Sequence, residues 1–357
     1  MQSLLQNKNK FSKYNGMGLT GLGNLGNTCW INSTLQCLSH TYEINEFLND
    51  GSYKKKLNME LPESAILVEW DNLRKMIWSE NCTISPGGFL QAIRKISHIK
   101  NKILFTGFAQ NDFPEFVLFI IDCFHNSIKR EVIMNIKGNV MNERDSLAKK
   151  CYEMMSDMYK KEYSEILTLF FGIHVSQIKS LENDILSEKP EPFFMLDLPI
   201  PEKSNSQENI TLFDCLDLYL EPEKLEGDNA WFNEKTNQKQ SVTKGIIIWS
   251  LPNILVIDFK RFTNLNQKNN CLIDFELENV NFKKYITGYN SDSYVYDLYG
   301  VCNHFGGVNG GHYSAYVKNN NGKWYNFNDT NVSEISANKI VSNSAYCLFY
   351  RKKKWST

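Results

Sequence analysis

The chain has 357 residues, of which 42% are hydrophobic, so it is long enough for one large domain or two ordinary ones with a sizeable core. Its 39 basic and 40 acidic residues give a net charge of −1, which favours neither nucleic acid nor an anionic membrane as a partner. No apolar run approaches the ~18 residues of a membrane span, and residues 1–8 lack the apolar core of a signal peptide.

The nine cysteines are irregularly spaced, and none of them belongs to a Cys-x-x-Cys pair. An odd number with this spacing argues against a disulfide framework and against a cysteine-rich zinc site. We therefore expect an intracellular location, in the cytoplasm, the nucleus or both, where a reducing environment would keep a catalytic thiol reduced.

Residues 1–16 are polar, and we expect a short, loose N-terminal extension there. The loop 23–27 follows, with two glycines and two asparagines that can turn tightly and adopt positive φ. Thr28 can cap a helix. The apolar residues after it have helical spacing: Ile31, Leu35 and Leu38. Cys29 is thus expected in the first turn of a helix, where unpaired N–H groups and the helix dipole lower the pKa of a thiol.

These features make Cys29 a candidate nucleophile, although most free cysteines are small buried hydrophobic residues. Three further helices are predicted from apolar residues at helical spacing: 64–78, 89–96 and 147–158. Asp112 and Glu115 have the spacing of a capping box, and Pro114 suits the first turn of a helix. The run 116–124 is almost wholly apolar, so the helix that it forms should be buried.

After about residue 166 the segments become shorter and richer in β-branched and aromatic residues, with turn residues between them. Six segments are predicted strands: 245–249, 254–259, 294–301, 312–318, 323–328 and 346–351. A helical first part followed by a β-rich second part predicts an α+β fold, in which helices pack against an antiparallel sheet.

His312 is the second candidate group, and four of the six residues before it are glycines, which let another backbone come close. The strands 312–318 and 323–328 predict a β-hairpin that brings Asn328 and Asp329 near His312. Either side chain could hold the imidazole of a Cys–His pair. A two- or four-residue loop would put Asp329 opposite His312, whereas a three-residue loop would put Asn328 there, and the sequence leaves both open.

The remaining histidines are scattered and show no metal-ligand spacing. His304 is the only rival base near His312, and it lacks the glycines that precede His312. The plainer alternative for His312 is a structural histidine in a strand.

Five segments of this chain together resemble the ubiquitin-specific protease family of deubiquitinating enzymes. They are similar, in the family's order, to its Cys box, its Gln-Gln-Asp-x-x-Glu-Phe segment, a further family segment, its Leu-Lys-Arg-Phe strand and its His box: 21–36, 110–116, 225–229, 255–262 and 310–329. The resemblance implies a papain-like cysteine peptidase with a right-hand architecture. It implies one catalytic domain at 17–352, with a helical thumb at about 17–165 and β-rich fingers and palm at about 166–352.

The resemblance also implies a role for each matching position. Cys29 is the nucleophile, and His312 is the general base. Asn328 holds the position of the third catalytic residue, and the adjacent Asp329 is a substitute for it. Asn24 matches the side-chain donor of the oxyanion hole, which would act together with the backbone N–H of Cys29.

The family cleaves after the terminal Gly-Gly of ubiquitin's Leu-Arg-Gly-Gly tail, so ubiquitin and ubiquitinated proteins are the expected partners. A narrow channel beside Gly310 and Gly311 would suit that tail. Asp112 and Glu115 match positions near the channel and could meet the arginines of the tail. Helix capping explains the same two acidic residues equally well. The oligomeric state is left open.

The chain departs from the family at the fingertips, where many members carry two Cys-x-x-Cys pairs that bind zinc. The corresponding segments 180–183 and 233–236 contain no cysteine, so four thiolate ligands are missing. We expect no metal ion and no other cofactor, and fingers held by the packing of their sheet alone.

Three other functions are weighed against a deubiquitinase. A module that binds ubiquitin with little or no activity is disfavoured because both Cys29 and His312 are present. A protease for a ubiquitin-like modifier would use the same catalytic groups, so only the finger and palm surfaces could distinguish it. A general papain-like endopeptidase is disfavoured by its different Cys motif and by the glycines of the expected channel.

Overall fold

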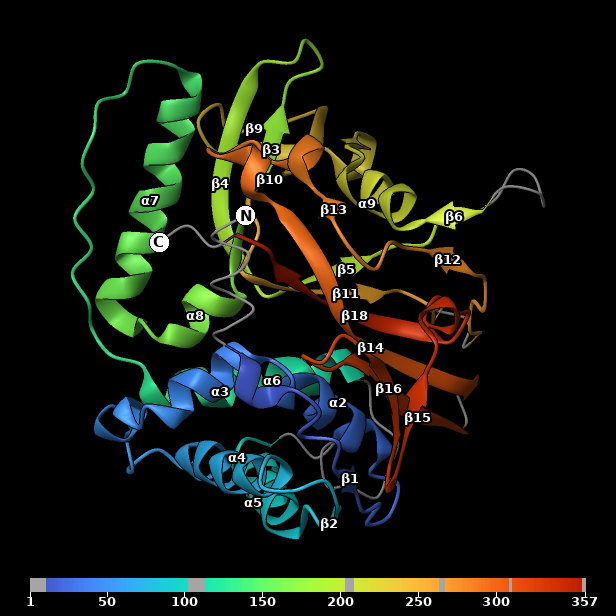
Figure 1. Ribbon diagram of the computed structural model, residues 1–357. Helices are drawn as coiled ribbons and strands as arrows, with labels where there is room; N and C mark the ends of the chain where they lie inside the picture. The colour runs from blue at the N-terminus through green and yellow to red at the C-terminus, as the bar shows by residue number, and fades with distance from the viewer. Residues whose placement is uncertain (1–10, 102–112, 203–208, 263–266, 308–309, 355–357) are drawn as a thin grey trace.

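The computed structural model describes residues 11–101, 113–202, 209–262, 267–307 and 310–354. Figure 1 shows a group of helices at the bottom, a large sheet beside them and a second sheet at the top. Within the described ranges, no helix combines the length and the apolar composition needed to cross a bilayer.

The first part of the chain is helical, as predicted. Its helices are α2 (Cys29–Ser39), α3 (Tyr42–Asn49), α4 (Ser64–Ile77), α5 (Gly87–Ile99) and α6 (Phe113–Ile128). The short strands β1 (Gly21–Leu22) and β2 (Thr83–Ile84) pair in parallel and join the start of this part to the segment before α5. Helix α3 was not predicted, because polar residues interrupt its short apolar stripe.

An eight-stranded sheet forms most of the second part, in the order β17-β16-β15-β14-β18-β11-β5, with β13 also paired to β14. Its strands are β5 (Met195–Leu198), β11 (Ile254–Phe259), β13 (Val280–Asn281), β14 (Val295–Gly307), β15 (Gly310–Lys318), β16 (Trp324–Asn328), β17 (Asn331–Ile335) and β18 (Ala345–Lys352). Along that order the pairs are antiparallel except β11 with β5, which is parallel. Five of the six predicted strands lie in this sheet.

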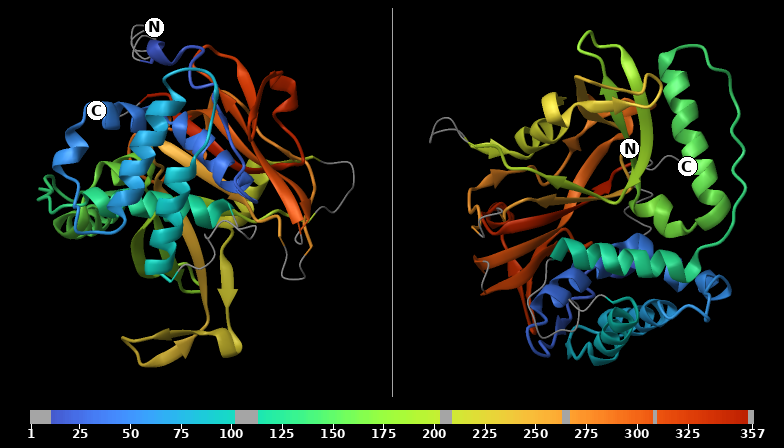
Figure 2. Two further views of the ribbon diagram at one scale, coloured as in Figure 1. Left: turned by 90° about the horizontal axis from the view of Figure 1, so that it is seen from below. Right: turned by 180° about the vertical axis from the view of Figure 1, so that it is seen from behind.

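A second, four-stranded sheet has the order β4-β3-β10-β7. Its strands are β3 (Gly172–Lys179), β4 (Ile185–Phe193), β7 (Glu223–Leu225) and β10 (Val242–Ser250). The hairpin of β8 (Trp231–Asn233) and β9 (Gln238–Gln240) projects from the rest of the molecule, at the bottom of the left view in Figure 2. These strands are the finger-like part of the fold.

Three more helices accompany the sheets: α7 (Glu143–Glu162), α8 (Glu165–Phe170) and α9 (Leu212–Leu220). The predicted stripe of α7 is a core face, because Leu147 and Cys151 pack with Val175 and Trp249 of the four-stranded sheet. Near α9, the short strands β6 (Ile210–Thr211) and β12 (Ile273–Asp274) pair in parallel.

The central strands of the large sheet are buried on both faces. Since successive strand residues point to opposite faces, Phe349 of β18 packs in the core shared with α2 and α6. Its neighbours Leu348 and Tyr350 pack in the core shared with α9. Burial on both faces explains why β11 is apolar almost throughout and has every residue buried.

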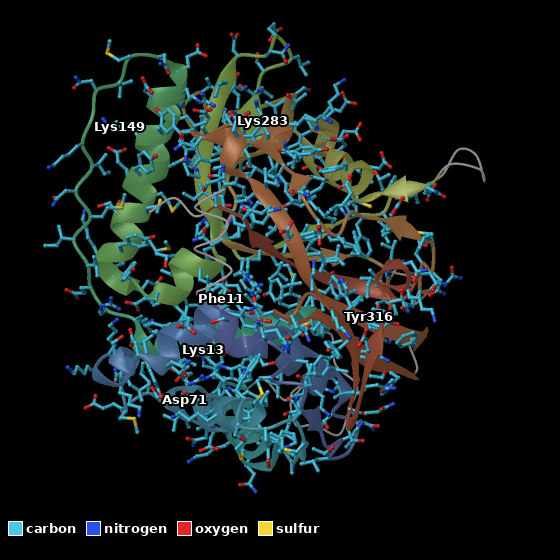
Figure 3. All side chains as sticks on the ribbon, in the orientation of Figure 1. Phe11, Lys13, Asp71, Lys149, Lys283 and Tyr316 are labelled. Carbon is cyan, nitrogen blue, oxygen red and sulfur yellow. The ribbon has the colours of Figure 1, made fainter. Side chains whose placement is uncertain are left out.

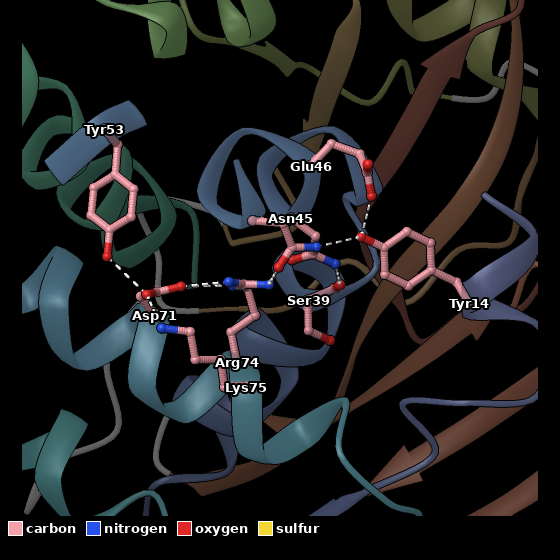
Figure 4. A network of polar contacts seen from close by, with 9 residues as sticks. Tyr14, Ser39, Asn45, Glu46, Tyr53, Asp71, Arg74 and Lys75 are labelled. Carbon is pink, nitrogen blue, oxygen red and sulfur yellow. Dashed lines mark hydrogen bonds and ion pairs between the residues drawn. The ribbon is translucent and has the colours of Figure 1, made fainter. Parts of the chain in front are cut away.

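The expectation of a loose N-terminal extension is wrong for residues 11–16; residues 1–10 lie outside the described part. Phe11 and Tyr14 are buried and pack against Tyr42, whose ring stacks on that of Tyr14 at 4.6 Å. The Tyr14 hydroxyl also donates a hydrogen bond to Glu46 of α3 at 2.5 Å (Figure 4). Phe11 and Lys13 thus lie on the helical part of the fold (Figure 3), because two aromatic anchors outweigh the polar residues around them.

Candidate active site

The loop before α2 has the predicted backbone. Gly26 and Asn27 have φ angles of 98° and 51°, and α2 begins at Cys29. Thr28 occupies the N-cap position, but its hydroxyl makes no capping bond to the helix. Instead it accepts a hydrogen bond from the Leu25 N–H at 3.0 Å, so the hydroxyl stabilises the loop rather than the helix end that we predicted.

Asn24 is held by this loop and by the far end of the chain. Its Oδ1 accepts hydrogen bonds from the N–H groups of Gly26 and Thr28, at 3.2 and 3.1 Å. Its Nδ2 donates to Oδ2 of Asp329 at 3.0 Å. Because a side-chain amide has two N–H donors, one donor of Asn24 stays available once Asp329 is bound.

His312 meets Asn328, with 2.5 Å between its Nε2 and the Asn328 Oδ1. An amide oxygen only accepts, so the ring must donate from Nε2, which leaves Nδ1 as the acceptor nitrogen. The tautomer follows from this contact alone.

The contact between His312 and Asn328 forms in a strand register that differs from both expected registers. Strands β15 and β16 pair Lys318 with Trp324 and Ala315 with Phe327, so five residues lie in the loop. The expected loops of two to four residues are therefore wrong. Extending the register would place position 330 opposite His312, and Asn328 lies one diagonal step away on the same face.

Asp329 follows the last residue of β16 and has a left-handed φ of 51°. Its Oδ1 accepts from the Asn32 side chain at 2.8 Å and its Oδ2 from Asn24, while its carbonyl accepts from the Leu22 N–H at 2.9 Å. The carboxylate therefore binds the Cys box and not the histidine. Asn32 was not predicted as a site residue, because it is one of several polar residues in α2 and only its contact with Asp329 distinguishes it.

The Cys29 thiol is buried, with 3% of the residue exposed. Burial raises its pKa above the ordinary value, the backbone N–H of Tyr313 lowers it, and the charge of Asp329 raises it. The net direction is upward, so the predicted lowering is wrong: desolvation outweighs the helix N-terminus. The influence of Tyr313 also places the thiol beside the start of β15, next to His312 in sequence.

The two glycines before His312 differ in their surroundings. A Cβ atom on Gly310 would meet nothing within 4 Å. One on Gly311 would lie 2.2 Å from Nε2 of His304 and 2.6 Å from the carbonyl oxygen of Phe305. Gly311 is thus required by packing inside its own hairpin.

His304 is buried beneath Gly311, one of the glycines that precede His312. Burial lowers its pKa to about 4. Its ring packs against Tyr313 at 4.7 Å between centroids. These contacts describe a core residue.

Of the two acidic residues expected near the tail channel, the structure describes only Glu115. Glu115 lies in the first turn of α6 and is half-buried. Asp112 lies outside the described residues, and so does any capping box that it would form.

The fingertip segments make turn contacts in place of metal ligands. Oγ of Ser180 accepts from the N–H groups of Glu182 and Asp184, at 3.2 and 3.1 Å. Oδ1 of Asn233 accepts from the N–H of Lys235 at 3.0 Å. In the part of the chain that the structure describes, no group of three or more His, Cys, Asp or Glu side chains could hold a metal ion.

The family model described as ubiquitin carboxyl-terminal hydrolase matches residues 20–350. The chain belongs to this family. Membership confirms the resemblance to ubiquitin-specific proteases that the sequence carried from the Cys box to the His box.

Relatives in the ubiquitin carboxyl-terminal hydrolase family come from animals, yeast and a virus. The chain is 33% identical to ubiquitin carboxyl-terminal hydrolase 2 of Bos taurus over 342 residues, which cover 93% of this chain and 55% of the relative. It is 28% identical to the probable ubiquitin carboxyl-terminal hydrolase R319 of Acanthamoeba polyphaga mimivirus, covering 98% and 93% of the two chains. The chain thus spans about half the length of the bovine relative.

Solved structures of the SAGA deubiquitinating module share the fold. The Ubp8/Sgf11/Sus1/Sgf73 module bound to ubiquitin aldehyde has a TM-score of 0.72 and 27% identity, over 95% of this chain and 70% of that one. The module with a Ubp8 variant, bound to monoubiquitin, has a TM-score of 0.71 and 26% identity, over 96% and 71%. The papain-like right-hand fold predicted from the sequence is confirmed.

Proposed function

We propose that this chain is a thiol-dependent deubiquitinating enzyme that hydrolyses the peptide or isopeptide bond after the C-terminal Gly-Gly of ubiquitin. The observation that carries the proposal is the contact of His312 with Asn328 beside Cys29, in a chain of the ubiquitin carboxyl-terminal hydrolase family. Structural neighbours bound to ubiquitin and to ubiquitin aldehyde support ubiquitin as the partner.

The reaction begins with proton transfer from the Cys29 thiol to Nδ1 of His312. Burial raises the pKa of the thiol, so the transfer to His312 supplies the thiolate that attacks the substrate. The thiolate attacks the carbonyl carbon of the last ubiquitin glycine, and the amine leaves with the proton from His312. Water then loses a proton to His312 and hydrolyses the thioester, which restores the thiol.

Asn24 and the Cys29 backbone N–H are the proposed oxyanion donors. The available N–H of the Asn24 amide would stabilise the oxyanion of each tetrahedral intermediate. Asp329 holds the other N–H and so fixes the orientation of the amide. In this assignment Asn328 orients the base, and Asp329 orients the oxyanion hole.

We also propose one catalytic domain at 17–352, with the thumb at about 17–165 and the fingers and palm at about 166–352. The family match over 20–350 supports these limits. Glu115 and Asp112 remain proposed contacts for the arginines of the ubiquitin tail, beside Gly310 and Gly311. An intracellular location and the absence of a metal cofactor fit nine free cysteines and fingertips without cysteine ligands.

The test is turnover of a ubiquitin C-terminal fluorogenic amide. Matched amides of ubiquitin-like modifiers are assayed separately, to compare ubiquitin with other modifiers as the substrate. We expect turnover of the ubiquitin amide only, and complete loss in Cys29→Ala with ubiquitin binding retained. Binding without turnover by the unaltered chain would support a ubiquitin-binding module instead. Preference for another modifier would identify a different substrate.

A further inference from the structure

Phe305 is an exposed aromatic residue beside the proposed general base. It lies in β14 with 42% of its surface exposed. In the ladder of β14 and β15 it is directly opposite His312, and the register runs without a shift from Gly300 with Val317 to the end of the hairpin. Opposite residues in a ladder project from the same face, with Cβ atoms about 4.5–5.5 Å apart. Phe305 and His312 are therefore lateral neighbours.

The neighbouring pair of the same ladder faces the other way. His304 and Tyr313 are opposite each other, and both are buried with their rings in contact. Phe305 belongs to none of the hydrophobic clusters formed by the described residues. The exposed part of the Phe305 side chain is therefore available to cover apolar surface of a bound molecule.

We infer that Phe305 packs against the aliphatic stem of the acceptor lysine in an isopeptide-linked substrate. The inference rests on the proposed function. His312 must lie within hydrogen-bond distance of the leaving nitrogen to return its proton. The carbon chain attached to that nitrogen then starts next to the ring and its lateral neighbour. In an isopeptide this chain is the four methylenes of a lysine, which are apolar and match a phenyl ring.

The acyl half of the substrate lies elsewhere in the site. The carbonyl carbon bonds to Cys29, and its oxygen points to the amide of Asn24, which is anchored to the Cys box. Phe305 instead belongs to the strand pair that carries the base. A contact at Phe305 therefore discriminates between leaving groups and not between acyl groups.

The test compares two substrates that share the acyl group. One is ubiquitin linked to the Nζ atom of a lysine in a short peptide, and the other is ubiquitin methyl ester. For Phe305→Ala we expect kcat/KM to fall about fivefold on the isopeptide, because one or two buried methylenes lose their contact. On the ester we expect a change of less than about twofold, because its leaving group has a single carbon. Phe305→Leu keeps an apolar side chain and is expected to retain most of the isopeptide activity.

Phe232→Ala is the matched control, since Phe232 is an aromatic residue of β8 with 48% exposure, on the finger hairpin. It should leave the ratio of the two substrates unchanged, and thermal melts should show every variant folded. An equal fall on both substrates in Phe305→Ala, or no fall on either, would overturn the inference while leaving the proposed function intact. Failure of the unaltered chain to cleave either substrate would overturn the proposed function, and the inference with it.

Discussion

At the scale of single residues, two adjacent side chains at the end of β16 bind two different parts of the site. Asn328 is the last residue of the strand and meets the ring of His312. Asp329 leaves the strand through a left-handed conformation and meets Asn24 and Asn32 instead. The neutral amide therefore orients the imidazole, and the carboxylate orients the amide proposed for the oxyanion hole.

This division predicts a pattern of coupling between mutations. Asn328→Ala and Asp329→Ala should each lower kcat more than they raise KM, and the double variant should be far slower than either single, with the two free-energy losses adding. Asp329→Ala should add little to Asn24→Ala, because it acts through Asn24. The measurement is kcat and KM on the ubiquitin fluorogenic amide for all five variants. Additive losses for Asn24 with Asp329 would show that the carboxylate acts by another route.

The raised pKa of the Cys29 thiol predicts a pH dependence for alkylation of the free protein. The thiolate fraction grows only as pH climbs through a pKa that burial has moved above the ordinary 9.0. Iodoacetamide should therefore modify Cys29 slowly at neutral pH, with a rate still rising beyond pH 9.0. Mass spectrometry of the Cys29 peptide follows the rate. A rate that is already at its plateau at neutral pH would mean that the thiol exists as an ion pair with His312.

The two glycines before His312 are expected to respond differently to a methyl group. Gly311→Ala should lower the free energy of unfolding by about 1–3 kcal/mol, because the new Cβ overlaps His304 and the Phe305 carbonyl. Gly310→Ala has open space and should leave stability unchanged, while KM for the ubiquitin amide should rise because the added methyl group narrows the proposed tail channel. Denaturant unfolding and steady-state kinetics test the pair. Equal stability of the two variants would contradict the packing argument.

At the scale of elements, Glu165 at the start of α8 joins three parts of the helical region. It accepts from Lys56 at 2.7 Å and from both terminal nitrogens of Arg130, at 2.7 and 3.0 Å. Burial raises the pKa of Glu165, but the hydrogen bonds from Arg130 and Lys56 outweigh burial and lower that pKa from 4.5 to about 2. The charged form is thus favoured by the folded state.

A carboxyl with a lowered folded pKa stabilises the protein above its unfolded pKa of 4.5. That contribution is lost as pH falls from 4.5 through about 2. Glu165→Gln should therefore lower the free energy of unfolding by about 2 kcal/mol at neutral pH, after allowance for partial exposure, with the difference shrinking over that window. Glu153→Gln is the control, because its pair with Lys149 is exposed and spans 3.8 Å. A difference independent of pH would show that packing and not charge explains the loss.

Hydrophobic periodicity was sufficient to predict most helices and strands, but not the elements whose order depends on contacts with distant parts of the chain. The spans of α4 and β11 follow directly from their apolar spacing. Helix α3 is a short helix whose buried side, with Tyr42 among its residues, faces the N-terminal segment. Its partners Phe11 and Tyr14 are about 30 residues away, so no local pattern could reveal that both segments are ordered together.

The sequence was sufficient to predict which residues form the candidate site, but not which of them contact one another. The Cys and His boxes point to Cys29 and His312 as candidates from their own local sequence, and to Asn328 and Asp329 as the two candidate partners of His312. The parity of the hairpin loop decides between Asn328 and Asp329, and it depends on a five-residue turn that strand periodicity did not fix. The direction of the Cys29 pKa depends on burial beneath β15, which is a tertiary property.

At the scale of the whole molecule, the fold brings together two ends of the chain that are about 300 residues apart. Asn24 and Asn32 of the helical part bind Asp329 of the sheet, with sequence separations of 305 and 297. Leu22 also donates its N–H to the Asp329 carbonyl. The proposed nucleophile and the proposed base thus come from different layers, and the seam between the layers is the proposed reaction site (Figure 1).

The most direct test of this account is reaction with ubiquitin that carries a thiol-reactive group at its C-terminus. We expect one ubiquitin per chain, attached at Cys29 by peptide mapping, with no adduct in Cys29→Ala and slower labelling in His312→Ala and Asn24→Ala. Ubiquitin with the same reactive group but without its terminal Gly-Gly should not label the chain. Attachment to a different cysteine, or equal labelling of Cys29→Ala, would contradict the assignment of Cys29 as the nucleophile at the seam.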